Sequence, residues 1–292
     1  MTDTLHRILP QVQKPARYVG GEYNQIVKDK RDVDVRVAFC FPDTYEIGMS
    51  NIGMRILYGL MNEMPGVWCE RVFAPWGDME AEMRKYAIPL YALESHDPVK
   101  AFDLIAFTIG YEMSYTNILN MLELSCVPLL AREREGLENI VFAGGVCAVN
   151  PEPLADFIDF FSLGEGEEIT KEIIDCYRQA KKDGCTKQEF LLRVSKIDGV
   201  YVPSFYEHTY NEDGTLAAIT PKNGAPARVR KRIMQDMDKS YFPTKTIVPS
   251  TEIVHDRTNL EIFRGCIRGC RFCQAGFCYR PVRAKSVDTL YK

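Results

Sequence analysis

Short apolar, β-rich runs alternate with amphipathic helical segments along much of the chain, and this alternation strongly constrains its fold. Residues 103–110 form a continuous apolar run, typical of a parallel strand buried on both faces. We predict further strands at residues 33–41, 140–143 and 160–163. Apolar residues at helical spacing predict helices at residues 51–64, 76–86, 117–124 and 165–181. Such repeated units predict an α/β domain, an open parallel sheet of the Rossmann or flavodoxin-like kind with helices on both sides.

Glycine and polar residues gather where the predicted strands end. They occupy residues 43–48, residues 111–117, the pair Gly144 and Gly145, and residues 164–166. Ligands of open parallel sheets bind beyond the carboxyl ends of the strands, and glycine lets the backbone approach a ligand closely. A tight turn explains such glycines nearly as well. The sequence therefore predicts a ligand site at this edge of the sheet.

Three cysteines stand within eight residues of a loop rich in arginine and glycine: Cys266, Cys270 and Cys273, in the spacing C-x3-C-x2-C. Thiolates this close in sequence can close on one inorganic cluster. A structural metal site is normally closed by four ligands, whereas a catalytic site keeps one position free. The set of three therefore favours an open, catalytic cluster. Two alternatives remain: Cys278 completes a zinc site or a closed cluster, or the thiols bind no metal.

The other six cysteines are scattered through predicted strands, helices and turns, and we interpret them as small core or surface residues: Cys40, Cys69, Cys126, Cys147, Cys176 and Cys185. Ten cysteines, no secretory signal and no apolar run of about 18 residues predict a soluble cytoplasmic protein without a membrane span. The net charge of −4 gives no global footprint for nucleic acid. The last quarter of the chain is nevertheless basic, from residues 228–232 onward.

Beyond the sheet domain we predict a short helix at residues 187–197, a β-hairpin at 199–220 with its turn at 211–214, and a connector at 221–249. Residues 258–263 predict the first strand of a (β/α) barrel that delivers the cysteine loop at its carboxyl end. Ser286 is the expected cap of the following helix. The expected units are an amino-terminal extension (1–33), the sheet domain (34–185), the helix, hairpin and connector (186–250), and the incomplete start of a barrel (251–292).

The predicted barrel is truncated. A complete (β/α) barrel repeats the strand–helix unit several times, and the chain supplies a single strand, its loop and the start of a helix. A lone parallel strand leaves backbone groups unpaired and buries little apolar area. We therefore expect the tail to be poorly ordered, or packed irregularly against the sheet domain or another chain, with its cysteine loop exposed.

The cysteine spacing, with the aromatic Phe272 directly before the last cysteine, resembles that of the radical S-adenosylmethionine (radical SAM) enzymes. The resemblance implies that Cys266, Cys270 and Cys273 hold three irons of a [4Fe-4S] cluster. It implies that the fourth iron chelates the amino and carboxylate groups of S-adenosylmethionine, with Phe272 beside this cofactor. It also implies a reducing partner such as flavodoxin or ferredoxin.

The sheet domain resembles the cobalamin-binding domain that precedes the barrel in one class of radical SAM proteins. The runs that carry this resemblance are residues 16–24, 45–54, 115–120 and 143–153. It implies radical methyl transfer, or a related C–H functionalisation, with cobalamin held at the strand ends. The residues implied for the cobalamin site are Asp43, Tyr45, Gly48, Gly144 and Gly145.

One departure from that class concerns the cobalt ligand. The signature D-x-H-x-x-G supplies a histidine nitrogen to cobalt, but the matching run here is Asp43-Thr44-Tyr45-Glu46-Ile47-Gly48. A phenol with an ordinary pKa near 10 is a poor neutral ligand compared with imidazole. We therefore predict that bound cobalamin has no protein ligand on its lower face, or that this cofactor has been lost.

Two further functions are compatible with the sequence. One is a non-catalytic module that binds cobalamin or docks a partner. The other is a zinc-stabilised nucleic-acid binder, favoured by the arginines around the cysteines and disfavoured by the net charge. In the enzyme interpretation, a companion chain or a longer polypeptide carries the rest of the barrel. The sequence does not identify the substrate.

Overall fold

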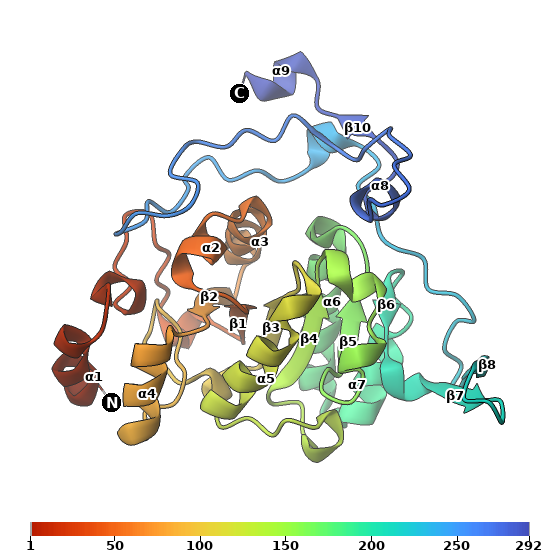
Figure 1. Cartoon of the computed structure of the whole chain (residues 1–292), viewed down its shortest axis with the longest axis horizontal. Coiled ribbons are helices and arrows are strands. Elements are labelled where there is room, and N and C mark those ends of the chain that lie inside the picture. Colours follow the sequence, from red (N-terminus) through yellow and green to blue (C-terminus); the bar gives the residue numbers. More distant parts are fainter. Residues whose placement is uncertain (1, 292) are drawn as a thin grey trace.

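The fold is built on a six-stranded, mostly parallel sheet, seen in a computed structural model that describes residues 2–291 (Figure 1). The strand order is β2-β1-β3-β4-β5-β6, and only β6 runs antiparallel to its neighbour. The strands are β1 (Val35–Phe41), β2 (Val67–Phe73), β3 (Leu104–Thr108), β4 (Ile140–Gly144), β5 (Phe160–Ser162) and β6 (Val200–Tyr201). The first five follow the flavodoxin-like order of doubly wound sheets, whose topological switch point lies between β1 and β3.

Helices cover both faces of the sheet. Alternate residues of β1 point to opposite faces: Val37 and Phe39 lie in one core, and Ala38 and Cys40 in the other. The first core is covered by α2 (Tyr45–Met49), α3 (Ile52–Glu63), α6 (Gly166–Asp183) and α7 (Lys187–Val194). The second is covered by α1 (Thr2–Ile8), α4 (Gly77–Lys85) and α5 (Tyr115–Leu124). The α/β domain that the periodicity predicts is confirmed.

Helix ends are satisfied by nearby side chains. The amide oxygen of Asn51 accepts a hydrogen bond from the Met54 amide at 2.9 Å and starts α3. Thr186 and Glu189 form a reciprocal capping box at the start of α7. The segment before β1 also belongs to the core, because Leu5, Ile8 and Tyr18 are buried against the α4 and α5 face.

Strand β2 is absent from the sequence-based prediction because charges interrupt its apolar run. Glu70 and Arg71 lie in the middle of this strand and are buried. Arg71 is only 1% exposed and forms ion pairs with Glu22 at 2.8 Å and Glu94 at 2.6 Å. Burial by itself lowers the pKa of Arg71, but the charges of Glu94 and Glu22 outweigh it and raise that pKa above its usual value.

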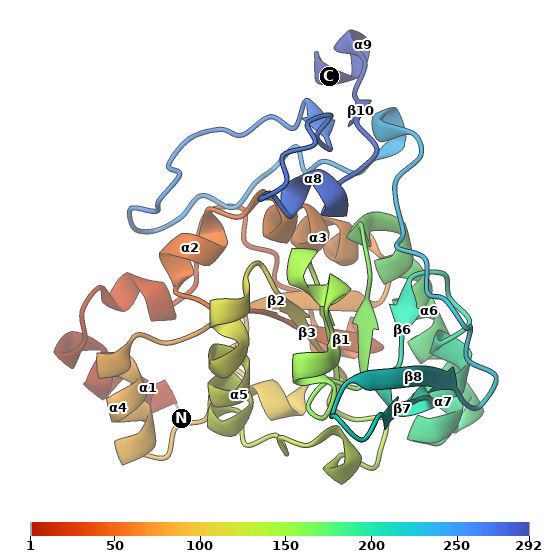
Figure 2. The same ribbon diagram turned by 45° about the vertical axis from the view of Figure 1, so that its right-hand side comes forward.

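The connector runs back across the carboxyl ends of the strands (Figure 2). It forms two isolated bridges: Arg232 pairs with Gly164 beside β5 of the sheet domain, and Val248 pairs with Tyr23 of the amino-terminal segment. The Asn24 side-chain amide also donates to the Thr246 carbonyl at 2.9 Å. Before the connector, β7 (Tyr206–Tyr210) and β8 (Leu216–Pro221) form the predicted hairpin, which projects from the body of the protein in Figure 1.

The tail contains four short elements: β9 (Phe263–Arg264), α8 (Ala275–Cys278), β10 (Arg283–Ala284) and α9 (Val287–Leu290). The prediction of a strand at residues 258–263 is wrong, apart from Phe263. A parallel strand needs neighbours to pair its backbone, and β9 instead pairs antiparallel with β10. Ser286 caps α9, as predicted, by accepting from the Thr289 amide. Among residues 2–291, no helix is long and apolar enough to cross a membrane.

Candidate functional site

A cavity of about 490 Å³ opens at the carboxyl ends of the strands. Its apolar floor comes from the strands and from α3, and includes Phe39, Ala106, Phe142 and Ile56. Its rim is rich in glycine, with Gly110, Gly144, Gly145, Gly164 and Gly166. The last part of the wall comes from the tail: Glu261, Arg264, Gly265 and Tyr279. The cavity therefore lies between the sheet domain and the start of the cysteine loop.

Two rim glycines are required by close backbone approach. Gly145 has φ of +104°, and a Cβ there would lie 2.5 Å from the Ile109 carbonyl oxygen. Gly164 has φ of +106°, and a Cβ there would lie 2.1 Å from the carbonyl oxygen of Arg232 in the connector. Only glycine tolerates both the positive φ and these contacts. The two residues fix where β4 and β5 end, and thus the shape of the rim.

Gly164→Ala is expected to lower the free energy of unfolding by about 2–4 kcal/mol, because the new Cβ adds a steric clash to a left-handed backbone. Urea denaturation measures the change. Gly110→Ala is the matched control, since it lies on the same rim, has no atom within 4 Å of the added Cβ, and should cost less than about 1 kcal/mol. Equal costs for the two variants would contradict the close approach of the connector at Gly164.

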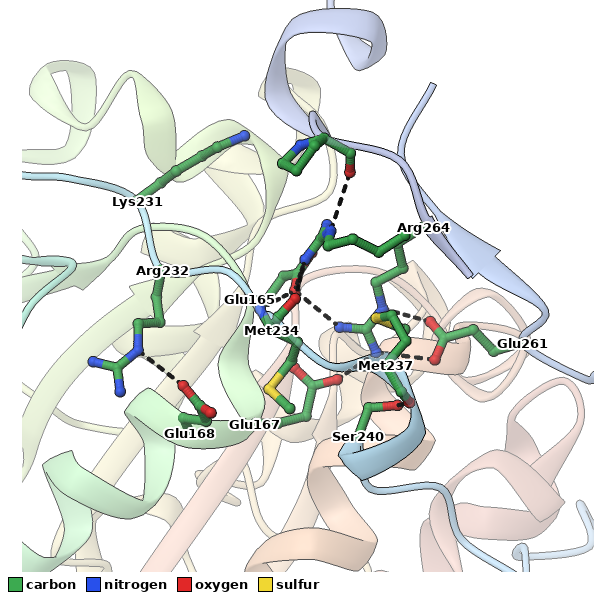
Figure 3. A network of polar contacts seen from close by, with 12 residues as sticks. Glu165, Glu167, Glu168, Lys231, Arg232, Met234, Met237, Ser240, Glu261 and Arg264 are labelled. Carbon is green, nitrogen blue, oxygen red and sulfur yellow. Dashed lines mark hydrogen bonds and ion pairs between the residues drawn. The ribbon is translucent and has the colours of Figure 1, made fainter. Parts of the chain in front are cut away.

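A network of carboxylates and arginines joins the sheet domain to the tail (Figure 3). Glu165, just before α6, binds Arg283 through two hydrogen bonds of 2.6 and 2.8 Å, and its carboxylate lies 3.5 Å from Arg264. Arg264 also pairs with Glu167 and with Glu261, the latter at 2.6 Å. Lys285 completes the network at 3.3 Å from Glu261. Each of these side chains is largely buried, so the pairs are shielded from water.

The network keeps Glu165 ionised. Burial by itself raises the pKa of this carboxyl group. Hydrogen bonds from Arg283 and the Met234 amide, together with the charges of Arg264 and Arg283, outweigh burial and hold the pKa below its usual value. A permanent negative charge therefore faces the two arginines at neutral pH.

Two cations of the connector's basic run, Lys231 and Arg232, are engaged within the protein, whereas Arg228 and Arg230 are exposed. Arg232 pairs with Glu168 at 3.0 Å and Glu172 at 2.6 Å, both on α6. The Lys231 ammonium group donates to the carbonyl oxygens of Cys278 and Arg280, at 2.6 and 2.7 Å. These cations serve to attach the connector and the tail. They therefore give little support to the nucleic-acid-binding interpretation.

The three predicted cluster cysteines lie on one loop between β9 and α8. Cys270 is exposed, and Cys266 and Cys273 are half-buried. The Cys273 amide donates to the Cys270 carbonyl at 3.1 Å, so these two share a tight turn. Phe272, between them, is 93% exposed. Within residues 2–291, no three His, Cys, Asp or Glu side chains come close enough together to hold a metal ion, so this arrangement does not bring the three thiols together.

The loop nevertheless fits an iron–sulfur cluster in its donor chemistry. All three donors are thiols, as such clusters require, and two already lie on one turn. The start of the loop is tightly fixed: Gly265 has φ of +98°, and a Cβ there would lie 2.5 Å from the Pro281 carbonyl oxygen. Convergence of the three thiols therefore requires a rearrangement within this exposed loop.

Cys278 lies on α8, which packs against the 3₁₀ turn Val146–Val149. Cys147 lies in that turn. Burial and the nearby Glu112 raise the pKa of Cys147 to about 11, and a charge on Cys278 contributes to raising it. Cys278 is therefore associated with the sheet domain. Of the other cysteines, Cys40 and Cys69 are buried, Cys126 is exposed, and Cys176 and Cys185 are half-buried.

Only some of the residues predicted for cobalamin lie at the strand-end cavity. Gly144 and Gly145 line the cavity, whereas Asp43, Tyr45 and Gly48 do not. Tyr45 is 1% exposed, and its hydroxyl donates to Glu22 at 2.9 Å. A Cβ on Gly48 would lie 2.2 Å from the Phe73 ring.

The position expected for a cobalt ligand therefore carries a core side chain. Tyr45 is held there by the buried Glu22 carboxylate and by an edge-on contact with Phe73. Gly48 serves the packing of the same ring. Asp43 accepts hydrogen bonds from its neighbour Thr44 at 2.7 Å and from Tyr111 at 3.4 Å. Of the residues predicted for cobalamin, Gly144 and Gly145 are therefore those that face the cavity.

The carboxylates that hold the tail carry no clear signal in the sequence. Glu165 was recognised only as part of a polar strand end, and Arg264 and Arg283 only as part of a basic region. The sequence features that could have predicted these contacts are the acidic run after β5 and the arginines that flank the cysteines. Glu261 and Glu167 carried no distinguishing pattern.

The fold and the site together define an α/β domain with a cavity at its strand ends, where the domain is joined to a cysteine loop. The chain belongs to the family described as radical SAM proteins, N-terminal, which matches residues 53–203. This family implies, in general, a [4Fe-4S] cluster and S-adenosylmethionine.

An uncharacterized protein of Methanocaldococcus jannaschii is similar to the chain, with 27% identity over 259 residues. The aligned region covers 87% of this chain and 44% of that protein. The chain thus spans less than half of the relative's length. No solved structure matches the chain.

Proposed function

We propose that the chain is the amino-terminal part of a radical SAM enzyme, in which Cys266, Cys270 and Cys273 ligate a [4Fe-4S] cluster. The observation that carries this proposal is the position of the cysteine loop, whose anchored ends form part of the wall of the strand-end cavity. Three thiols leave one iron open for the amino and carboxylate groups of S-adenosylmethionine, with Phe272 beside that cofactor. The chemistry that the cluster supplies when bound is one-electron reduction of S-adenosylmethionine.

The chain's own residues then have two tasks. Arg264 and Arg283 anchor the ends of the loop to Glu165 and Glu167, while Gly265 allows the backbone to pass close to Pro281. The apolar floor of the cavity, with Phe39 among its residues, excludes water from a ligand bound there. In this proposal, the cluster loop lies on one side of this wall and the ligand in the cavity lies on the other.

The second cofactor in this proposal is cobalamin in the strand-end cavity, which points to radical methyl transfer or a related C–H functionalisation. Support comes from the rim, where Gly144 and Gly145 line the cavity at the end of β4. Histidines are absent from the cavity lining among the described residues. Cobalamin bound there therefore has no imidazole ligand from this chain, and Gly144 and Gly145 are the residues that would hold it.

Two partners complete the proposed enzyme. A flavodoxin or ferredoxin supplies the electron, and a companion segment or chain carries the rest of the barrel. The tail supports the second partner because its apolar side chains are exposed, including Phe263, Ile267 and Phe277. The greater length of the archaeal relative supports it as well.

A non-catalytic docking module is the second candidate function. It is favoured by the separation of the three thiols in the described part of the chain. In this alternative, the sheet domain holds a ligand or partner and the cysteine loop binds no cluster.

Anaerobic reconstitution followed by metal analysis separates these functions. We expect about four iron ions and about four acid-labile sulfide ions per chain. Isotope-labelled S-adenosylmethionine should show magnetic coupling to the reduced cluster. A cob(II)alamin complex should show no splitting from a protein nitrogen. Stoichiometric zinc without sulfide would overturn the enzyme proposal, and a corrinoid spectrum without iron would support the docking module.

A further inference from the structure

Two arginines face each other across the ribbon that closes the cysteine loop. Arg264 of β9 and Arg283 of β10 are register partners in this antiparallel pair. Like charges directly opposite each other destabilise a β-ladder. The ribbon is also very short, with two residues in each strand, so its backbone pairing alone is weak. Something outside the ribbon has to offset the repulsion.

Glu165 provides that compensation from the sheet domain. Its carboxylate forms a two-point contact with Arg283 and lies 3.5 Å from Arg264, so one negative charge serves both arginines. Arg264 has additional carboxylate partners in Glu167 and Glu261, whereas no other carboxylate pairs with Arg283 among the described residues. The ion pairing of Arg283 thus depends on Glu165 alone.

Glu165 is also fixed in place. It directly precedes α6, and its carboxylate accepts the Met234 amide at 2.6 Å. Its backbone amide donates to the Arg232 carbonyl at 2.9 Å. A side chain held from both the helix start and the connector is suited to setting the position of another segment.

We propose that Glu165 is a positioning residue for the cluster loop: it holds the two ends of the loop together, and against the cavity, by neutralising Arg283 and Arg264. It touches no cluster ligand in this role. The expected effect of Glu165 on a cluster rests on the proposed function. Its effect on the position of the loop is independent of any metal. Loss of the Glu165 charge should open the ribbon and let the ends of the loop separate.

Hydrogen–deuterium exchange of the metal-free full chain tests the loop directly. Glu165→Gln keeps the size of the side chain and an acceptor for Met234 but removes the charge. We expect amides of residues 262–264, 279–280 and 282–285 to exchange about tenfold faster, as for loss of one charge-assisted contact. The matched control is Glu168→Gln, in the first turn of the helix that Glu165 precedes, because Glu168 pairs with Arg232 and is 46% exposed. It should leave this exchange unchanged.

A rescue variant distinguishes charge neutralisation from a general structural role. Adding Arg283→Gln to Glu165→Gln removes one of the two facing cations, so exchange in the ribbon should return toward the wild-type rate. Unaltered exchange in β4 will show that the sheet domain stays folded. Wild-type exchange in Glu165→Gln, or no rescue in the double variant, would overturn the proposal.

Reconstitution with iron and sulfide adds the cluster readout. Glu165→Gln should retain several-fold less iron than the wild type, with a broadened spin-resonance signal from the reduced cluster, and Glu168→Gln should match the wild type. If the wild type itself binds no cluster while Glu165→Gln still accelerates exchange, the enzyme proposal fails and the positioning role stands. Full cluster content with a wild-type signal in Glu165→Gln would overturn the positioning role at the cluster.

Discussion

Alanine substitution of Cys266, Cys270 or Cys273 is expected to abolish cluster binding, with each single variant losing nearly all of its iron and sulfide after anaerobic reconstitution. A cluster held by three thiolates has no spare protein ligand, so removal of one leaves two irons open and the site unstable. Iron and sulfide analysis and the visible absorbance of each variant measure the effect.

Cys278→Ala is the matched control for this series. Cys278 is close in sequence to the three ligands, but it lies on α8 beside Cys147 and its backbone carbonyl is engaged by Lys231. We expect the variant to keep its cluster. Loss of the cluster in Cys278→Ala with retention in Cys266→Ala would show that the radical SAM assignment of the ligands is wrong.

Arg71→Met is expected to lower the free energy of unfolding by about 3–5 kcal/mol, because it leaves the buried carboxylates of Glu22 and Glu94 without their cation. Methionine fills most of the space, so the cost reflects mainly uncompensated charge. Urea denaturation, followed by far-ultraviolet circular dichroism, measures the change.

The control for the buried ion pairs is Arg84→Met on α4. Arg84 also pairs with two carboxylates, Glu80 and Glu123, but it is 43% exposed. Exposed pairs contribute little, so the expected cost is about 0–1 kcal/mol. Similar costs for Arg71→Met and Arg84→Met would mean that the buried network does not hold β2 in the sheet.

The sheet domain was largely predictable because its signals are local. Residues 104–110 are apolar apart from Thr108, and α3 carries helical spacing with Asn51 at its start, so local sequence alone indicates both elements. Strand β2 was not predicted because Glu70 and Arg71 are charged. Both are nevertheless buried, since they form ion pairs with residues distant in sequence. No local pattern reveals that Arg71 meets Glu22 and Glu94.

The candidate site was predictable only in part, for the same reason. Glycines after a strand indicate a rim, and Gly144 and Gly145 do line the cavity. The motif at Tyr45 gives a position in the sequence, but the direction of its side chain depends on the buried Glu22. Strand β9 depends on a partner about twenty residues later, and the contact of Glu165 with Arg283 depends on the whole fold.

The pairing of Tyr23 with Val248 has a consequence for the order in which the protein matures on the ribosome. The segment around Tyr23 is synthesised early, but its strand partner and the Thr246 carbonyl that binds Asn24 are made more than two hundred residues later. The sheet can assemble before that point because its strands lie between residues 35 and 201. The amino-terminal segment, however, completes its contacts only when the connector has emerged, immediately ahead of the cysteine loop.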